Sequence, residues 1–98
     1  MYVAVCRINL HIYASRSLKD RRQVVQSVTA RLRGKFPIAV ADVGDQDTWQ
    51  SAIIGIAAVS GNPTLAREIV TAAASYAQSI APEAEVTLDG VDVFDYGE

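Results

Sequence analysis

Hydrophobic and polar side chains alternate along the first residues of the chain, MYVAVCRINLHI. One apolar set occupies every second position: Ala4, Cys6, Ile8, Leu10 and Ile12. The residues between them become polar towards the end of the stretch. A period of two residues is typical of a β-strand with one buried face. We therefore expect a first strand whose even-numbered side chains lie in the core.

A helical period replaces this alternation after residue 17. Apolar side chains recur three or four residues apart, at Leu18, Val24, Val25, Val28, Leu32 and Phe36. Ser17 followed by Asp20 is a helix start signal, because each side chain can bond a backbone N–H that the helix leaves unpaired. Gly34 and Pro37 are expected to end this first helix.

Two further strands and a loop follow the helix. IAVADV (residues 38–43) and SAIIGIAAVS (51–60) read as strands, and GDQDTWQ (44–50) joins them as a hairpin loop. The second of these strands is apolar on both faces, which is typical of a strand covered on both sides.

A second helix and a last strand complete the pattern. Asn62 before Pro63 is a favoured cap and first-turn pair. The apolar positions of this helix are Leu65, Ile69, Ala72, Ala73, Tyr76 and Ile80, and Pro82 follows them. In EVTLDGVDVFDY (85–96) the apolar alternation shifts phase at Gly90, which predicts a β-bulge.

The element order is βαββαβ over residues 1–98, a single domain. This order predicts an α+β, ferredoxin-like fold with a four-stranded antiparallel sheet and two helices on one face. The other face needs a cover, and a homodimer is the simplest one. The loop before the first helix and the hairpin loop are expected at the same end of the sheet.

Charge is divided unevenly along the chain, although the net charge is only −2. Residues 1–41 hold eight of the nine basic and one of the eleven acidic side chains, a balance of +7, and the remainder carries −9. The basic residues gather in SRSLKDRR (15–22), where a helix begins. Cations are mildly unfavourable at the positive end of a helix dipole, so their presence indicates an anionic partner.

The basic set forms the candidate nucleic-acid-binding surface: Arg16, Lys19, Arg21, Arg22 and Arg33. At about 100° per residue, one flank of the helix carries Lys19, Arg22, Gln26 and Arg33. Arg21 falls near the apolar stripe and needs a partner, for which Asp45 or Asp47 of the hairpin loop is a candidate. The alternative is that these cations are all paired internally.

SLKDRRQVV follows the first predicted strand, and VADVGDQDTWQSAIIG spans the predicted hairpin. Together these two motifs resemble those of the YlxP-like family of small bacterial proteins of unknown function. The chain keeps the motif residues Ser17, Leu18, Lys19, Arg21, Arg22, Gln46, Asp47, Trp49 and Gln50. It differs at Gln23, where the family has a further basic residue, and at Asp45, where the family has glutamate. The motif loop therefore consists of Asp45, Gln46, Asp47, Trp49 and Gln50.

The resemblance implies a ferredoxin-like, cytosolic bacterial protein whose association with translation genes points to RNA or the ribosome. We expect a non-catalytic RNA- or ribosome-associated protein; the alternative is a homodimeric interaction or regulatory module without a nucleic-acid partner. Trp49 either stacks on a base or plugs the end of the sheet as a core residue. Alanine at Lys19, Arg21 and Arg22 is expected to weaken RNA binding and leave folding intact.

Catalytic and metal-binding interpretations are less well supported. His11 is the only histidine, and Cys6 belongs to the set predicted for the core. Asp45 and Asp47 alone make an incomplete set of oxygen ligands for a divalent cation. The chain also lacks the glycine-rich loop of acylphosphatases, which share the predicted fold. We expect no enzyme activity, cofactor or metal. The lone cysteine and the absence of a leader or membrane span suit a cytoplasmic protein.

Overall fold

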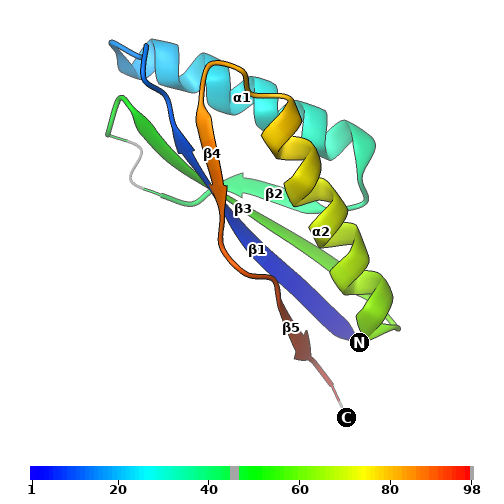
Figure 1. Cartoon of the computed structure of the whole chain (residues 1–98). Coiled ribbons are helices and arrows are strands. Elements are labelled where there is room, and N and C mark those ends of the chain that lie inside the picture. The colour runs from blue at the N-terminus through cyan, green and yellow to red at the C-terminus, as the bar shows by residue number, and fades with distance from the viewer. Residues whose placement is uncertain (45–46, 98) are drawn as a thin grey trace.

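The computed structural model describes residues 1–44 and 47–97, which form an antiparallel sheet with two helices on one face (Figure 1). The elements are β1 (Tyr2–His11), α1 (Leu18–Lys35), β2 (Ala39–Asp42), β3 (Ser51–Ser60), α2 (Pro63–Ser79), β4 (Glu85–Leu88) and β5 (Asp92–Asp95). The strands lie in the order β2-β3-β1-β4, and β5 also pairs with β1. The predicted ferredoxin-like α+β fold is confirmed.

The core lies between the helices and the even-numbered side chains of the two central strands. In β1 the alternating apolar set is buried, with Ile8 fully inaccessible and Cys6 only 4% exposed. Across the register from β1, Ile54 and Ile56 of β3 are also buried. The period of two therefore identified the buried face of each central strand correctly.

The first helix begins where predicted and ends one residue later than Gly34. Ser17 is its N-cap, and its side chain accepts a hydrogen bond from the backbone N–H of Asp20. At the other end the helix continues through Gly34 to Lys35, and Phe36 leaves it with an extended backbone. Pro37 disfavours a helical conformation at Phe36, so proline rather than glycine sets this boundary.

The second helix packs on the sheet through small side chains. Its buried residues are Ala66, Val70, Ala73, Ala74 and Ala77. Leu65, which the pattern placed on the apolar side, is 48% exposed. The apolar face is thus rotated towards the alanines, because residues without long side chains let the helix axis approach the strands closely.

The last predicted strand is divided in two by a bulge. Ile8 of β1 lies opposite Leu88, whereas Val5 lies opposite Asp92, so two residues of β1 face three residues of the last segment. The sheet therefore has five strands rather than four. The extra residue restores the phase of the alternation, and Val91 packs against the core. The predicted bulge at Gly90 is confirmed.

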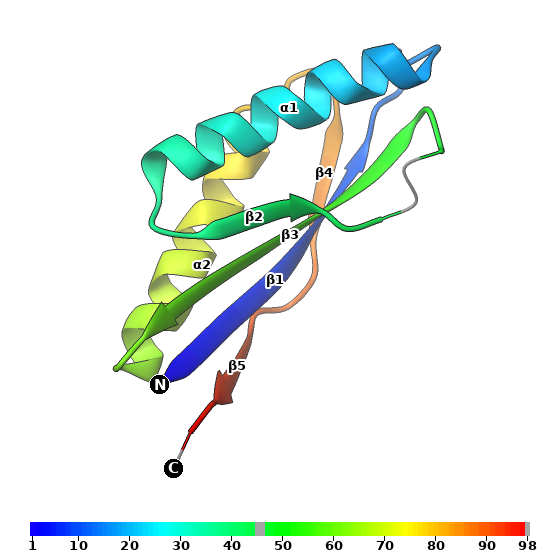
Figure 2. The same ribbon diagram turned by 180° about the vertical axis from the view of Figure 1, so that it is seen from behind.

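The opposite face of the sheet carries no helix (Figure 2). Val43, Val59 and Phe94 are more than half exposed there, at 57%, 60% and 56%. A groove of about 850 Å³ crosses this face, and Gly55 and Ala57 of β3 are among its lining residues. Within the described residues, neither helix is long and apolar enough to cross a bilayer.

Candidate nucleic-acid interface

A reciprocal capping arrangement starts α1. The Ser17 hydroxyl oxygen accepts from the Asp20 N–H at 3.1 Å, and the Asp20 carboxylate accepts from the Arg16 N–H at 3.0 Å. These bonds satisfy backbone donors that the helix itself cannot. The Asp20 carboxylate is thus used for capping, and in the described residues no ion pair joins it to a neighbouring cation.

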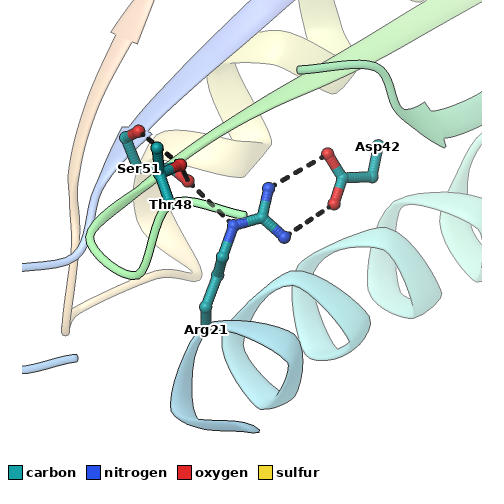
Figure 3. Close-up of polar contacts among 4 residues, drawn as sticks. All are labelled: Arg21, Asp42, Thr48 and Ser51. Atoms are coloured by element: carbon teal, nitrogen blue, oxygen red, sulfur yellow. Dashed lines mark hydrogen bonds and ion pairs between the residues drawn. The ribbon is translucent and has the colours of Figure 1, made fainter. Parts of the chain in front are cut away.

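Arg21 is buried and lies between α1 and the hairpin (Figure 3). Its Nη1 and Nη2 atoms donate to the two carboxylate oxygens of Asp42, at 2.9 and 3.3 Å. Its Nε donates to the Ser51 carbonyl oxygen at 2.9 Å. Asp42, in β2, is therefore an ion-pair partner of this cation, and the sequence did not single it out. Asp45, one of the two candidates from the loop, lies outside the described residues.

Further hydrogen bonds tie the loop before α1 to the start of β3. The Gln50 side-chain amide donates to the carbonyl oxygens of Tyr13 and Ser15, at 3.2 and 3.3 Å. The Ile12 N–H donates to the Gln50 carbonyl oxygen at 2.8 Å. Both views of the ribbon place these segments at one end of the sheet (Figures 1 and 2). The predicted neighbourhood of SRSLKDRR and the hairpin loop is confirmed.

The remaining predicted cations lie in a different setting from Arg21. Arg16, Lys19, Arg22 and Arg33 are all exposed, and in the described residues none of them forms an ion pair. The Arg33 Nη2 atom donates to the Val40 carbonyl oxygen at 3.0 Å, which holds this side chain against β2. Uncompensated positive charge therefore remains on this side of the molecule.

A groove of about 290 Å³ runs between α1 and β2. Residues that line it include Arg22, Gln26, Thr29 and Arg33 from α1 and Ala41 from β2. Three of these are members of the flank that the helical period predicted. Arg22 and Arg33 are eleven residues apart, which is about 16 Å along a helix rising 1.5 Å per residue. The groove therefore presents the exposed cations Arg22 and Arg33, and its lining also includes Val25 and the Arg21–Asp42 ion pair.

Trp49 lies at the surface, with 54% of its area exposed. The alternative that it plugs the end of the sheet as a core residue is therefore wrong. A pocket of about 640 Å³ is lined by Trp49, its neighbours Asp47, Thr48, Gln50 and Ser51, and His11 of β1. Of the predicted motif loop, Asp47, Trp49 and Gln50 are described and exposed, whereas Asp45 and Gln46 lie outside the described residues.

Tyr13 is a residue of this region that the sequence analysis missed. Its ring lies 4.1 Å from the His11 ring, measured between centroids, with the planes 38° apart. Its hydroxyl donates to the Glu85 carboxylate. This hydrogen bond is the main cause that raises the pKa of Tyr13, with desolvation and the negative charge of Glu85 adding to it. The signal available in the sequence was a polar and aromatic end to an otherwise apolar strand.

Cys6 is placed where a thiol is inert. Its Sγ donates to the Asp89 carbonyl oxygen at 3.3 Å. Burial raises the pKa of the thiol, and the charges of Asp89 and Asp92 raise it further. The neutral thiol is therefore favoured, and thiolate is the nucleophilic form. Among residues 1–44 and 47–97, no three histidine, cysteine or acidic side chains gather closely enough to hold a metal ion.

The sequence of this chain is similar to a known protein family and to a known bacterial protein. The family described as "Protein of unknown function (DUF503)" matches residues 3–88, a range that contains all of α1, the hairpin and β3. "Uncharacterized protein YlxP" of Bacillus subtilis (strain 168) is 34% identical over 83 residues, which cover 85% of this chain and 89% of that protein.

Proposed function

The chain belongs to the DUF503, or YlxP-like, family, and from this premise we propose that it is a cytoplasmic, non-catalytic protein that binds RNA, free or in the ribosome, through the basic flank of α1. The observation that carries the proposal is the division of the cations into two groups. Arg21 is buried against Asp42, whereas Lys19 and Arg22 are exposed and form no ion pair among the described residues.

An RNA backbone fits the charge and shape of this flank. Arg22 and Arg33 line the same groove, and phosphates bound there would release counterions from the strand. A phosphate near the start of α1 also removes the unfavourable placement of cations at the positive end of the helix dipole. The proposed surface therefore comprises Arg16, Lys19, Arg22 and Arg33. Arg21 is left out because its donors already serve the fold.

Fluorescence anisotropy of a labelled single-stranded RNA 12-mer tests this proposal. The double variant Lys19→Ala/Arg22→Ala is expected to bind more weakly, with the slope of log K against log salt reduced by about 1.4, or about 0.7 for each lost phosphate contact. Arg31→Ala is the control for the single variant Arg22→Ala, because each removes one positive charge from the same helix, whereas the double variant removes two. Arg31 is exposed and lies nine residues from Arg22, on the opposite side of the helix.

Ribosomes supply the physiological arm of the same test. The wild-type protein is expected to co-sediment with ribosomes at low salt and to dissociate at moderate salt, and the double variant to remain in the supernatant at both. Equal behaviour of the double variant and Arg31→Ala, with both folded by circular dichroism, would contradict a role for this flank.

The second candidate function is self-association through the helix-free face of the sheet. Its supporting observation is the apolar end of that face, where Val59 and Phe94 are exposed on the two strands that flank β1 at Val3. Exposed apolar patches of this kind mark interaction surfaces. Native mass spectrometry is expected to show twice the 10.5 kDa chain mass, and Val59→Glu to return the monomer. A wild-type monomer at high concentration would exclude this candidate.

A further inference from the structure

The pocket at the hairpin end of the sheet combines an exposed indole with an imidazole that contacts a tyrosine ring. Trp49 and His11 both line it, from the loop before β3 and from the end of β1. The two segments are held in register, because His11 lies opposite Ser51 in the sheet. The two aromatic groups are thus carried by β1 and by the residues that lead directly into its partner strand β3.

The His11 ring is supported on one side. Tyr13 lies against it, and the Tyr13 hydroxyl is anchored on Glu85 of β4. Within residues 1–44 and 47–97, no hydrogen bond or ion pair engages the imidazole nitrogens. The ring can therefore offer both a flat surface and a polar edge to a ligand.

Planar, uncharged or weakly charged groups suit such a pocket better than a bare phosphate. Two of its lining side chains, Trp49 and His11, are aromatic, and Asp47 contributes a negative charge. Base–aromatic stacking tolerates any sequence, because every nucleobase has a π-face. A base within a double helix is already stacked on its neighbours, so only an unpaired base can enter.

Hydrogen bonds also connect the pocket to the loop that leads into the basic start of α1. Gln50, a pocket residue, donates its side-chain hydrogen bonds to Tyr13 and Ser15, directly before the Arg16 to Arg22 segment. An RNA strand whose phosphates contact the start of α1 can therefore place one of its bases in the pocket at this end of the sheet.

We infer that the His11–Trp49 pocket takes an unstacked nucleobase of single-stranded RNA, an inference that rests on the proposed RNA binding. The phosphates supply charge contacts at α1, and the pocket supplies stacking. The occupant is thus a single strand, not a duplex.

Trp49 is the only tryptophan of the chain, so its emission reports on the pocket directly. Single-stranded RNA 6-mers are expected to quench it on titration, and a 6-mer with abasic residues, which keeps all phosphates, is not. The base-containing strand is expected to bind about fivefold to a hundredfold more tightly than the abasic strand, the range that one stacked base provides.

Variants separate stacking from structural roles. Trp49→Ala is expected to abolish the preference for base-containing RNA measured by anisotropy, and Trp49→Phe to retain most of it. His11→Ala keeps the fluorescent reporter and is expected to weaken quenching. Leu65→Ala, an exposed apolar residue of α2, is the control that should change neither.

The outcomes distinguish this inference from the proposed function. If both strands bind equally, with salt-dependent binding that Lys19→Ala/Arg22→Ala weakens, the pocket inference fails and the RNA-binding proposal stands. If neither strand binds, both fail. Equal affinity for a DNA 6-mer would overturn the assignment to RNA. Saturable quenching by a nucleoside monophosphate at the same concentrations would overturn the inference that the occupant is an RNA strand and would indicate a free nucleotide instead.

Discussion

Arg21 of α1 and Asp42 of β2 form a two-pronged ion pair, with Nη1–Oδ2 and Nη2–Oδ1 separations of 2.9 and 3.3 Å. The side chains are only 5% and 19% exposed. The third donor of the guanidinium reaches the Ser51 carbonyl oxygen. One buried cation thus connects the helix, the edge strand and the start of β3, and so positions the exposed cations beside it.

Arg21→Ala is expected to lower the free energy of unfolding by about 3 kcal/mol, because it removes the two charge-assisted hydrogen bonds to the mostly buried Asp42 carboxylate. Arg21→Lys should recover part of this loss, since an ammonium cannot make the two parallel bonds. Urea denaturation followed by circular dichroism measures both. Arg22→Ala, next along the helix, is the control and should stay within about 0.5 kcal/mol of wild type.

This pair also revises an experiment that the sequence suggested. A triple alanine variant at Lys19, Arg21 and Arg22 was expected to leave folding intact. Because Arg21 is buried, that variant would mix a stability defect with any loss of binding. Equal unfolding free energies for Arg21→Ala and Arg22→Ala would show that the buried pair contributes little to stability.

Much of the fold could be predicted because it depends on local patterns. The period of two in β1 and β3, the Ser17 cap and the bulge at Gly90 each leave a signature within a few residues. The partner of Arg21 could not be predicted in this way. Asp42 occupies an ordinary strand position, and only the pairing of β2 with β3 brings it to the helix.

The candidate site was predicted in outline and missed in detail for a similar reason. Topology alone places the basic helix start beside the hairpin loop. The exposure of Trp49 and the contact between the Tyr13 and His11 rings depend on side-chain directions at the end of the sheet, which no short sequence window specifies. The buried face of α2 likewise differs from the predicted one. Alanine is only weakly hydrophobic, but its small side chain lets the helix pack closely against the sheet.

The start of α1 supplies a second stability prediction. Ser17→Ala removes the side-chain acceptor for the Asp20 N–H and is expected to lower the free energy of unfolding by about 1 kcal/mol. Ser17→Asp keeps an acceptor and should lose much less. Chemical denaturation of the two variants measures the difference. Equal losses would mean that the hydroxyl does not act as a cap.

Alkaline pH is expected to weaken the fold through Cys6. Its pKa is raised above the ordinary 9.0 by burial first and by Asp89 and Asp92 after that. Below pH 9 the thiol is protonated in both states, so its contribution to stability is complete. As pH rises further, the unfolded chain ionises first, and the free energy of unfolding falls.

Cys6→Ala should flatten this alkaline decline above about pH 9, measured by denaturation at a series of pH values. Tyr13→Phe is the useful comparison, because the pKa of Tyr13 is also raised, by its bond to Glu85. A wild-type curve that declines no more steeply than that of Cys6→Ala would contradict the assignment.

The bulge between β4 and β5 allows a test that separates length from residue type. A Cβ added at Gly90 meets no atom within 4 Å, so Gly90→Ala is expected to change stability by less than about 1 kcal/mol. Deleting Gly90 leaves Asp89 and Val91 opposite two residues of β1, so the pairs Ile8–Leu88 and Val5–Asp92 can persist in a regular ladder with Val93 still on the core side. The deletion is therefore expected to cost less than about 2 kcal/mol in a urea unfolding measurement, which is the low end for truncating a large buried aliphatic side chain to alanine. A larger loss would show that the bulge itself, and not only the register on either side of it, is needed for the pairing of β5 with β1.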